Sequence, residues 1–339
     1  MDTATQQGPA ASWAYRDLKS QREMRLLVVQ PGSFDDFIRC RLVHVKTDTL
    51  LEYEAISYTW ADETGDATKT KTILLGNSPF LVTANCEAAL KRIRKDSVTR
   101  TVWIDAVCIN QDNKNEQGHQ VQLMPDIYSR ATRVLIYLGD PLNEESEGLM
   151  RLDNTRATVG SLPTPEEDPE LAASVLRSVK KAVSSLCGRR YFSRVWILQE
   201  VALARAAIVI CGKYEVPWRW FRNHAKSLAS DPYFSESPLP KAVTLEPRKH
   251  RDKSDLMNLL DDARNCHATD PRDKVFAVFG LIQCPTTLGL VPNYNATVEE
   301  VYTDAALQIA SLHGIENLLI RACDQRNYES LPTWVPDWS

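Results

Sequence analysis

The sequence predicts an α/β protein with an open, mainly parallel sheet flanked by helices, extra β-hairpins and a helical C-terminal part. Two segments, TVWIDAVCIN and RVLIYLGD, are apolar almost throughout, as are strands buried on both faces of a parallel sheet. Between them, EQGHQVQLMPDIYSRA has helical spacing of its apolar residues. This alternation is typical of an open α/β sheet, whose ligands bind beyond the carboxyl ends of the strands.

The first hundred residues predict strands, hairpins and one helix. MRLLVVQPG and FIRCRLVHVKT read as two strands that can pair as a hairpin, and YEAISYTW is a third strand that runs into a polar, acidic loop. TILLGNSPFLVT predicts a tight hairpin around Gly76 and Asn77. We expect Asn85 to cap the helix that follows, CEAALKRIRK.

The middle of the chain adds three expectations. Pro125 should kink or interrupt the helix over 116–131. Residues 141–170 carry many acids and prolines, which predicts a solvated surface loop with part of a helix. A helix over 170–186 and the strand-like AAIVICG come after this insertion.

The last third of the sequence has the pattern of helices and loops. Thr269 or Asp270 can cap a helix that has Pro271 in its first turn, and VEEVYTDAALQIASLHG reads as an amphipathic helix ended by Gly314. The sequence predicts a flexible N-terminal arm over 1–20, an α/β domain over 21–215 with an inserted acidic loop and helix at 141–190, and a mainly helical extension over 216–339 packed on that domain.

Composition narrows the class of protein. Of 339 residues, 43% are hydrophobic and 25% are charged, which is typical of a folded globular chain. A net charge of −4 and the lack of a basic stripe argue against nucleic-acid binding. With no apolar run of the roughly 18 residues that span a bilayer and no secretory signal, we expect a cytoplasmic location and no membrane span. The eight scattered cysteines are interpreted as reduced, mostly buried thiols.

Glu200 is the sharpest anomaly in the sequence. It is the only charged residue in VWILQEVALA, and a carboxylate buried without a partner is costly. Either a cation such as Arg189 or Arg194 folds back to pair with it, or its pKa rises, or it faces a cleft where a ligand uses it.

A second set of candidates lies at strand ends. Asp105 interrupts an apolar strand, and it accepts backbone N–H groups, caps a neighbouring helix or contributes to a pocket. Ser57, Tyr58 and Trp60 end another strand, where they either pack or line a site, Trp60 by stacking on a planar ring. No phosphate-binding glycine loop and no zinc motif is present in the sequence, so no metal or cofactor is expected.

Several segments together resemble the fungal heterokaryon incompatibility (HET) family. They are RLLVVQPG, YEAISYTWAD, VTANCEAALKRIR, VWIDAVCINQDNKNEQGHQVQLMPDIYSRATRVLIYLGD, RVWILQEVALA, TDPRDKVFAVFGL and LPTWVPDWS. The resemblance implies a role in fungal non-self recognition that ends in programmed cell death. The last segment closes the sequence, which fits either a short member or a module of a longer protein.

HET domains are in turn remotely similar to TIR domains, which implies a TIR-like, flavodoxin-like core. Trp196 and Glu200 are spaced like the tryptophan and catalytic glutamate of NAD-cleaving TIR domains, although Ile197 stands where TIR helices usually have cysteine. This similarity implies an NAD(P)+ glycohydrolase in which Glu200 binds the nicotinamide ribose, Tyr58 and Trp60 pack against rings, and Asp105 orients the pocket.

The alternative interpretation is a non-catalytic death-signalling module that self-associates or docks a partner, with Glu200 as a buried anchor. Under either interpretation the expected partners are another copy of the chain on activation and an upstream recognition protein. NAD+ is then a substrate rather than a resident cofactor.

Overall fold

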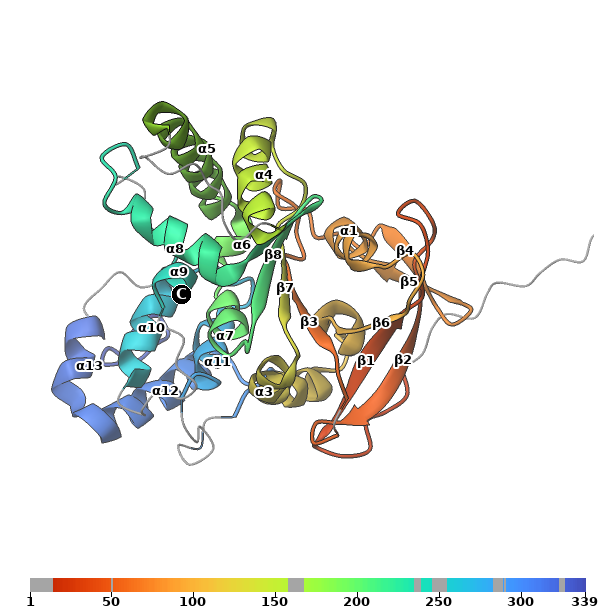
Figure 1. Ribbon diagram of the computed structural model, residues 1–339. Coiled ribbons are helices and arrows are strands. Elements are labelled where there is room, and N and C mark those ends of the chain that lie inside the picture. Colours follow the sequence, from red (N-terminus) through yellow and green to blue (C-terminus); the bar gives the residue numbers. More distant parts are fainter. Residues whose placement is uncertain are drawn as a thin grey trace, which may run out of the picture.

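A mixed nine-stranded sheet forms the centre of the part of the chain that the computed structural model describes, and helices cover it (Figure 1). The described residues are 15–49, 51–157, 168–234, 239–245, 255–282, 289, 291–322 and 327–339. The strands are β1 (Glu23–Val29), β2 (Arg39–Lys46), β3 (Glu54–Ser57), β4 (Lys71–Leu75), β5 (Ser78–Val82), β6 (Arg100–Trp103), β7 (Val134–Tyr137), β8 (Ala207–Cys211) and β9 (Tyr214–Pro217).

The strand order is β5-β4-β2-β1-β6-β3-β7-β8-β9, and the four strands from β6 to β8 are mutually parallel. The hairpins β1–β2 and β4–β5 are antiparallel, which confirms both predictions. A third hairpin, β8–β9, was missed, because its second strand, YEVP, is short and directly precedes a helix. Gly212, at a φ of +51°, makes its tight turn. The open α/β class is therefore confirmed, with parallel strands from β6 to β8, one further parallel pair, β2–β4, and antiparallel pairs elsewhere in the sheet.

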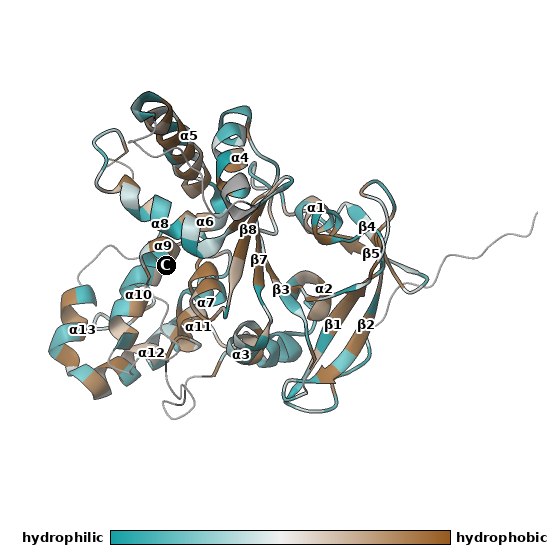
Figure 2. Cartoon of the chain, in the orientation of Figure 1, coloured by the Kyte–Doolittle hydropathy of each residue, from teal (hydrophilic) through white to brown (hydrophobic). Residues whose placement is uncertain are grey.

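The helices are α1 (Ala84–Ile93), α2 (Asp105–Cys108), α3 (Lys114–Arg130), α4 (Asn143–Ala157), α5 (Pro169–Cys187), α6 (Arg190–Ser193), α7 (Ile197–Ala202), α8 (Trp218–Leu228), α9 (Lys241–Thr244), α10 (Leu256–Arg264), α11 (Asp273–Phe279), α12 (Val298–His313) and α13 (Ile315–Ala322). In Figure 1, α1 lies on the side of the early strands, whereas α10 to α13 gather at the opposite side of the molecule. Figure 2 shows the central strands β7 and β8 as largely hydrophobic.

Two local predictions around the early helices are wrong, and for Pro125 the predicted interruption of its helix is wrong. The strand in TVWIDAVCIN ends at Trp103, because Asp105 begins the short helix α2 and accepts the backbone N–H of Ala106. Thr83, not Asn85, caps α1, since the Asn85 amide donates to the carbonyl of Thr59. The helix α3 runs through Pro125 without a break, because its buried residues pack it into the core on either side of the proline.

The acidic insertion is also more ordered than predicted. Its N-terminal half forms α4, and Glu145 is fully buried there instead of facing solvent. Residues 158–167 of the insertion lie outside the described residues. Neither Thr269 nor Asp270 caps the next helix, since α11 begins at Asp273 and the Asp270 carboxylate binds the Arg272 guanidinium.

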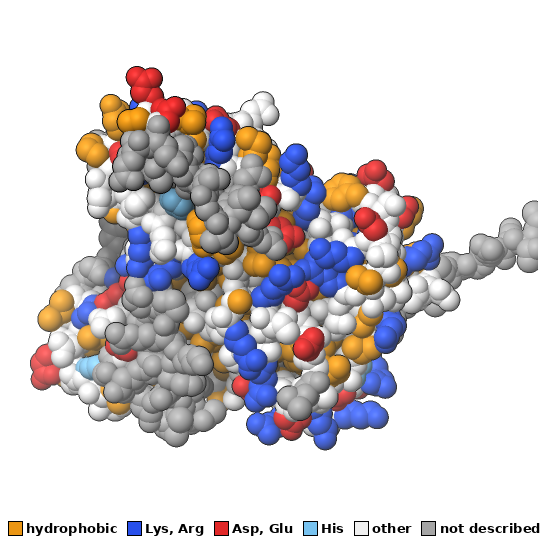
Figure 3. Space-filling model, viewed as in Figure 1, with side chains coloured by type: hydrophobic (Ala, Val, Ile, Leu, Met, Phe, Trp, Pro, Cys, Tyr) orange, Lys and Arg blue, Asp and Glu red, His pale blue; other side chains and the backbone are white. Residues whose placement is uncertain are grey.

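The first described residue of the N-terminal arm contacts the rest of the protein. Residues 1–14 of the expected arm lie outside the described residues, and Tyr15 packs against the body by donating its hydroxyl to the carbonyl of Val107. Six cysteines are described as thiols without a disulfide, and five of them are buried: Cys40, Cys86, Cys108, Cys211 and Cys266. In the described helices, no stretch is both long and apolar enough to cross a bilayer. The face in Figure 3 carries both charge signs, with Lys and Arg gathered at its lower right.

Candidate functional site

A cavity of about 430 Å³ opens beyond the carboxyl ends of the parallel strands β3 and β6. Trp60 follows β3 and Asp105 follows β6, and both line it. Trp196 and Glu200 line it from the region of α7. The structure therefore brings together four of the six residues proposed from the sequence, at the edge where an open α/β sheet binds ligands.

Glu200 is held by a network beneath the cavity. Its carboxylate forms hydrogen bonds with the Arg194 guanidinium at 3.2 and 3.3 Å, and it accepts a hydrogen bond from the Ser57 hydroxyl. Ser57 also shares a hydrogen bond of 2.6 Å with the Tyr191 hydroxyl. The salt bridge between Arg194 and Glu200 that was considered from the sequence is therefore present. Glu200 is only 2% exposed, and it nevertheless lies in the cavity wall.

The local chain geometry explains this placement. Trp196 precedes α7, and the Glu200 N–H donates to the Trp196 carbonyl, so these two side chains lie one helical turn apart. Arg194 follows the short helix α6 and pairs by a parallel bridge with His267. That bridge attaches a segment from the C-terminal part of the chain to the same wall.

Each of the two tryptophans in the cavity wall is fixed by a carboxylate. The Trp60 indole N–H donates to Asp105 at 2.9 Å, and the Trp196 indole N–H donates to Asp273 at 3.0 Å. Asp273 also accepts the Tyr294 hydroxyl at 2.6 Å. Because the polar edge of each indole is satisfied by protein, the apolar ring is what remains for a ligand.

Burial and neighbouring charges shift the pKa values of the charged groups in the site. Burial raises the pKa of Asp105 to about 6, against the opposing effect of Arg194. Burial also raises the pKa of Asp273 to about 6. Although burial alone disfavours a charged guanidinium, the Glu200 and Asp105 carboxylates raise the pKa of Arg194 above its ordinary value. Arg194 thus stays charged, while the two aspartates titrate near neutrality.

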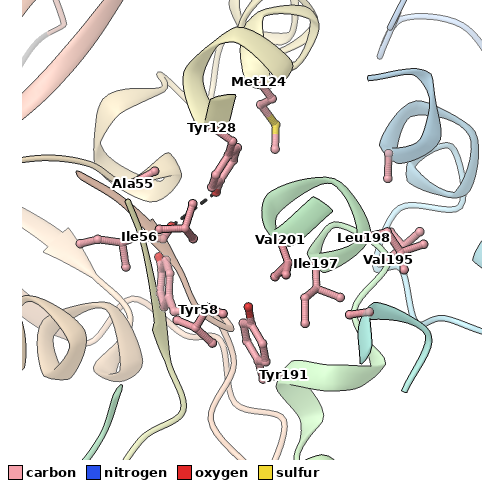
Figure 4. Packing of buried hydrophobic residues seen from close by; sticks show 14 of the residues in the cluster. Ala55, Ile56, Tyr58, Met124, Tyr128, Tyr191, Val195, Ile197, Leu198 and Val201 are labelled. Atoms are coloured by element: carbon pink, nitrogen blue, oxygen red, sulfur yellow. Dashed lines mark hydrogen bonds between the residues drawn. The ribbon is translucent and has the colours of Figure 1, made fainter. Parts of the chain in front are cut away.

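Tyr58 and Ser57 do not line the cavity. Tyr58 is 1% exposed and packs in the core next to Cys86 of α1, and Figure 4 shows it among the buried side chains. Burial raises its pKa well above the ordinary value. Contact between Tyr58 and a ligand ring therefore does not fit this geometry, whereas Ser57 acts on the site through Glu200.

The sequence did not reveal the C-terminal contribution to the wall. His267, Asp270, Asp273 and Tyr294 line the cavity, although this part of the chain reads as scaffold. Asp273 stands in the charged run PRDK just before the apolar VFAVF, so no local pattern sets it apart as the apolar surroundings set Glu200 apart. The partner of Asp273, Trp196, lies 77 residues earlier, which no local pattern reveals.

Comparison with known proteins identifies the segment that carries most of the network. Residues 53–200 match the family model of the heterokaryon incompatibility protein (HET). The HET resemblance expected from the sequence is thereby confirmed over this segment, which we call the HET segment.

Similarity to one individual protein covers more of the chain than the HET segment does. The chain is 26% identical over 395 aligned residues to a Neurospora crassa protein, "Heterokaryon incompatibility protein 6, OR allele". The match covers 93% of this chain but 58% of the relative, so the chain spans little more than half the length of that protein. No solved structure matches the chain, and the TIR-like core stays a prediction.

The cavity wall extends beyond the HET segment. Glu200 is the last residue of the family match, whereas Asp273 and Tyr294 lie well after it. The tryptophan that precedes Glu200 by one turn is thus fixed by a carboxylate from outside the HET segment.

Proposed function

We propose that the chain acts in fungal non-self recognition and programmed cell death, and that its cavity cleaves the N-glycosidic bond of NAD+ or a related nucleotide. The HET match and the name of the Neurospora relative support the biological role. One observation carries the chemical proposal: the Glu200 carboxylate lies in the wall of a cavity that two tryptophans also line.

The proposed reaction breaks the bond between the ribose C1′ atom and the nicotinamide nitrogen. The bonding electrons leave with nicotinamide, water adds to C1′, and one proton passes to solvent. Positive charge develops on the ribose in the transition state, and a nearby carboxylate stabilises such charge. The hydrogen bonds from Arg194 to Glu200 are longer than typical charged pairs of about 2.7–2.9 Å, so a ribose hydroxyl can compete for the carboxylate.

The test is whether purified protein consumes NAD+ and releases nicotinamide, and whether Glu200→Gln abolishes this. Glutamine keeps the size of the side chain and an oxygen for Arg194, so the variant separates charge from packing. We expect nicotinamide release to fall by at least about a hundredfold, as when one electrostatic stabiliser is removed.

Glu144→Gln is the matched control. Glu144 is half-exposed on α4, where it pairs with Lys181 away from the cavity, and the substitution makes the same chemical change. We expect it to retain wild-type turnover. A Glu200→Gln protein that is folded and still cleaves NAD+ at the wild-type rate would rule the mechanism out.

A second candidate is a non-catalytic signalling module that acts by self-association or partner docking. The nearly complete burial of Glu200 and its bonds to Arg194 and Ser57 favour it, because they satisfy the carboxylate without a ligand. This alternative expects Glu200→Gln to keep cell killing in a fungal expression assay while NAD+ levels stay constant. Killing that is lost together with NAD+ consumption excludes it.

A further inference from the structure

We propose that Arg190 and Lys114 form a phosphate subsite of this cavity, so that its ligand is a phosphorylated nucleoside whose base packs against Trp60 or Trp196. The inference deepens the proposed function, since it assigns the class of ligand that the same cavity takes. It concerns binding and does not require that the bound molecule is cleaved.

The charges that line the cavity are only partly paired with one another. Glu200 is paired with Arg194, and Asp270 is paired with Arg272. Arg190 and Lys114 also line the cavity, but within the described parts of the chain neither is ion-paired to a carboxylate. They are therefore cations available to a ligand.

Both cations are held close to neighbours without being neutralised by them. The Arg190 guanidinium lies beside Gly65, where a Cβ atom would be 3.6 Å from its Nη1 atom, and the nearby Glu63 accepts the Arg190 backbone N–H. Lys114 donates to the neutral Gln117 amide. Although burial opposes it, hydrogen bonds from Arg272 lower the pKa of Asp270, and Lys114 contributes to the same effect.

Arg190 and Lys114 lie nearer the solvent than Glu200 does. Lys114 is exposed and Arg190 is partly exposed, whereas Glu200 is 2% exposed. Asp105 and Asp273 are also protected by their bonds to the indoles. A phosphate is repelled from the acidic interior and attracted to the basic rim, which orients a nucleotide with its base inward.

The aromatic side chains that line the cavity fit a nucleobase. With each indole N–H engaged by an aspartate, the two tryptophans offer ring surface in fixed orientations. Every nucleobase has a π-face that can stack on an aromatic side chain. A volume of about 430 Å³ falls in the range of small-molecule sites. Arginine and lysine together supply the forked and the point-like contacts that phosphate groups accept.

The experiment compares AMP with adenosine as ligands, measured by calorimetry with the full chain. We expect AMP to bind at least about tenfold more tightly than adenosine, because hydrogen bonds to charged groups contribute more than about 1.4 kcal/mol. Added salt should weaken AMP binding and leave adenosine binding nearly constant. The double variant Arg190→Gln/Lys114→Gln should bind AMP only as tightly as adenosine, with its affinity for adenosine unchanged.

Lys181→Gln is the matched control, because Lys181 is an exposed lysine of α5 that does not line the cavity. It should keep the preference for AMP. Equal binding of the two ligands by the wild-type protein, binding of neither, or a double variant that keeps the preference would each overturn the phosphate subsite. A clear AMP preference in a protein that does not consume NAD+ supports the subsite and rejects only the hydrolysis.

Discussion

Two arginine–glutamate pairs near the end of the parallel strands have different surroundings. Arg189 and Arg194 are both candidates for pairing with Glu200, but Arg189 instead binds Glu145 of α4. Glu145 is fully buried and also accepts hydrogen bonds from the Leu142 N–H and the Ser185 hydroxyl. The Arg189 pair is almost closed off from solvent, with its side chains 8% and 0% exposed, whereas the Arg194 pair borders the cavity.

This difference separates a structural role from a functional one. The Arg189 guanidinium also donates to the carbonyls of Leu138 and Asp140, so it connects β7 to the helices that follow. The Arg194 side chain is 16% exposed, and Asp105 lies near enough to shift its pKa. A buried pair closed by protein can only support the fold, while a pair in a cavity wall can also act on a ligand.

The largest expected effect is on the Arg189–Glu145 pair. Glu145→Ala leaves the Arg189 charge buried and unpaired, which should lower the free energy of unfolding by about 3–5 kcal/mol in urea denaturation. Glu200→Ala should cost less, because cavity water can solvate Arg194. The double variant Glu145→Leu/Arg189→Met should recover most of the loss. Equal losses in the two alanine variants would mean that the pairs do not differ.

The same comparison shows how much of the fold could be predicted from sequence. Hairpins and central strands were predictable because their apolar patterns and turns are local, as at Gly76. Glu145 was misread as solvated, since it stands in the acidic run NEESEG and its partner Arg189 lies 44 residues further on. Local sequence reports local structure, and it does not show which distant residue neutralises a charge.

The candidate site was predictable to the same extent. Glu200, Asp105 and Trp60 stand out because each breaks a local pattern or ends a strand. Tyr58 and Trp60 both follow β3, and strand alternation would place residues two positions apart on the same side. The strand ends at Ser57, so the sequence pattern does not show that Tyr58 is buried at 1% exposure while Trp60 lines the cavity. Asp273 was taken for part of a helix start, and only the folded chain brings it to the Trp196 indole.

Stability should also depend on pH through Asp273, a residue of the cavity wall. The pKa of Asp273 is raised to about 6 in the folded protein from an ordinary value near 3.8. Folding thus favours its protonated form, so its contribution to stability is present below pH 4 and is lost as the pH rises through 6. For one carboxyl the loss is at most about 3 kcal/mol.

Asp273→Asn removes this titration. Relative to wild type, the variant should gain stability as the pH rises from 4 to 7, measured as the difference between two series of urea unfolding curves. Asp17→Asn serves as a control, because Asp17 is exposed and does not line the cavity. Parallel curves for wild type and Asp273→Asn over this pH range would contradict the raised pKa.

The smallest expected effect tests the support beneath Glu200. Tyr191→Phe removes the hydroxyl that shares a hydrogen bond with Ser57, and it should lower stability by about 0.5–1.5 kcal/mol. Tyr233→Phe, at a position 94% exposed, should change stability by less than about 0.5 kcal/mol. Because Tyr191 acts through Ser57 and does not line the cavity, NAD+ cleavage should fall by less than about tenfold. A loss of turnover as large as that of Glu200→Gln would instead make the tyrosine hydroxyl part of the chemistry. The Arg194–Glu200 pair would then depend on the hydrogen bond between Tyr191 and Ser57 for its function.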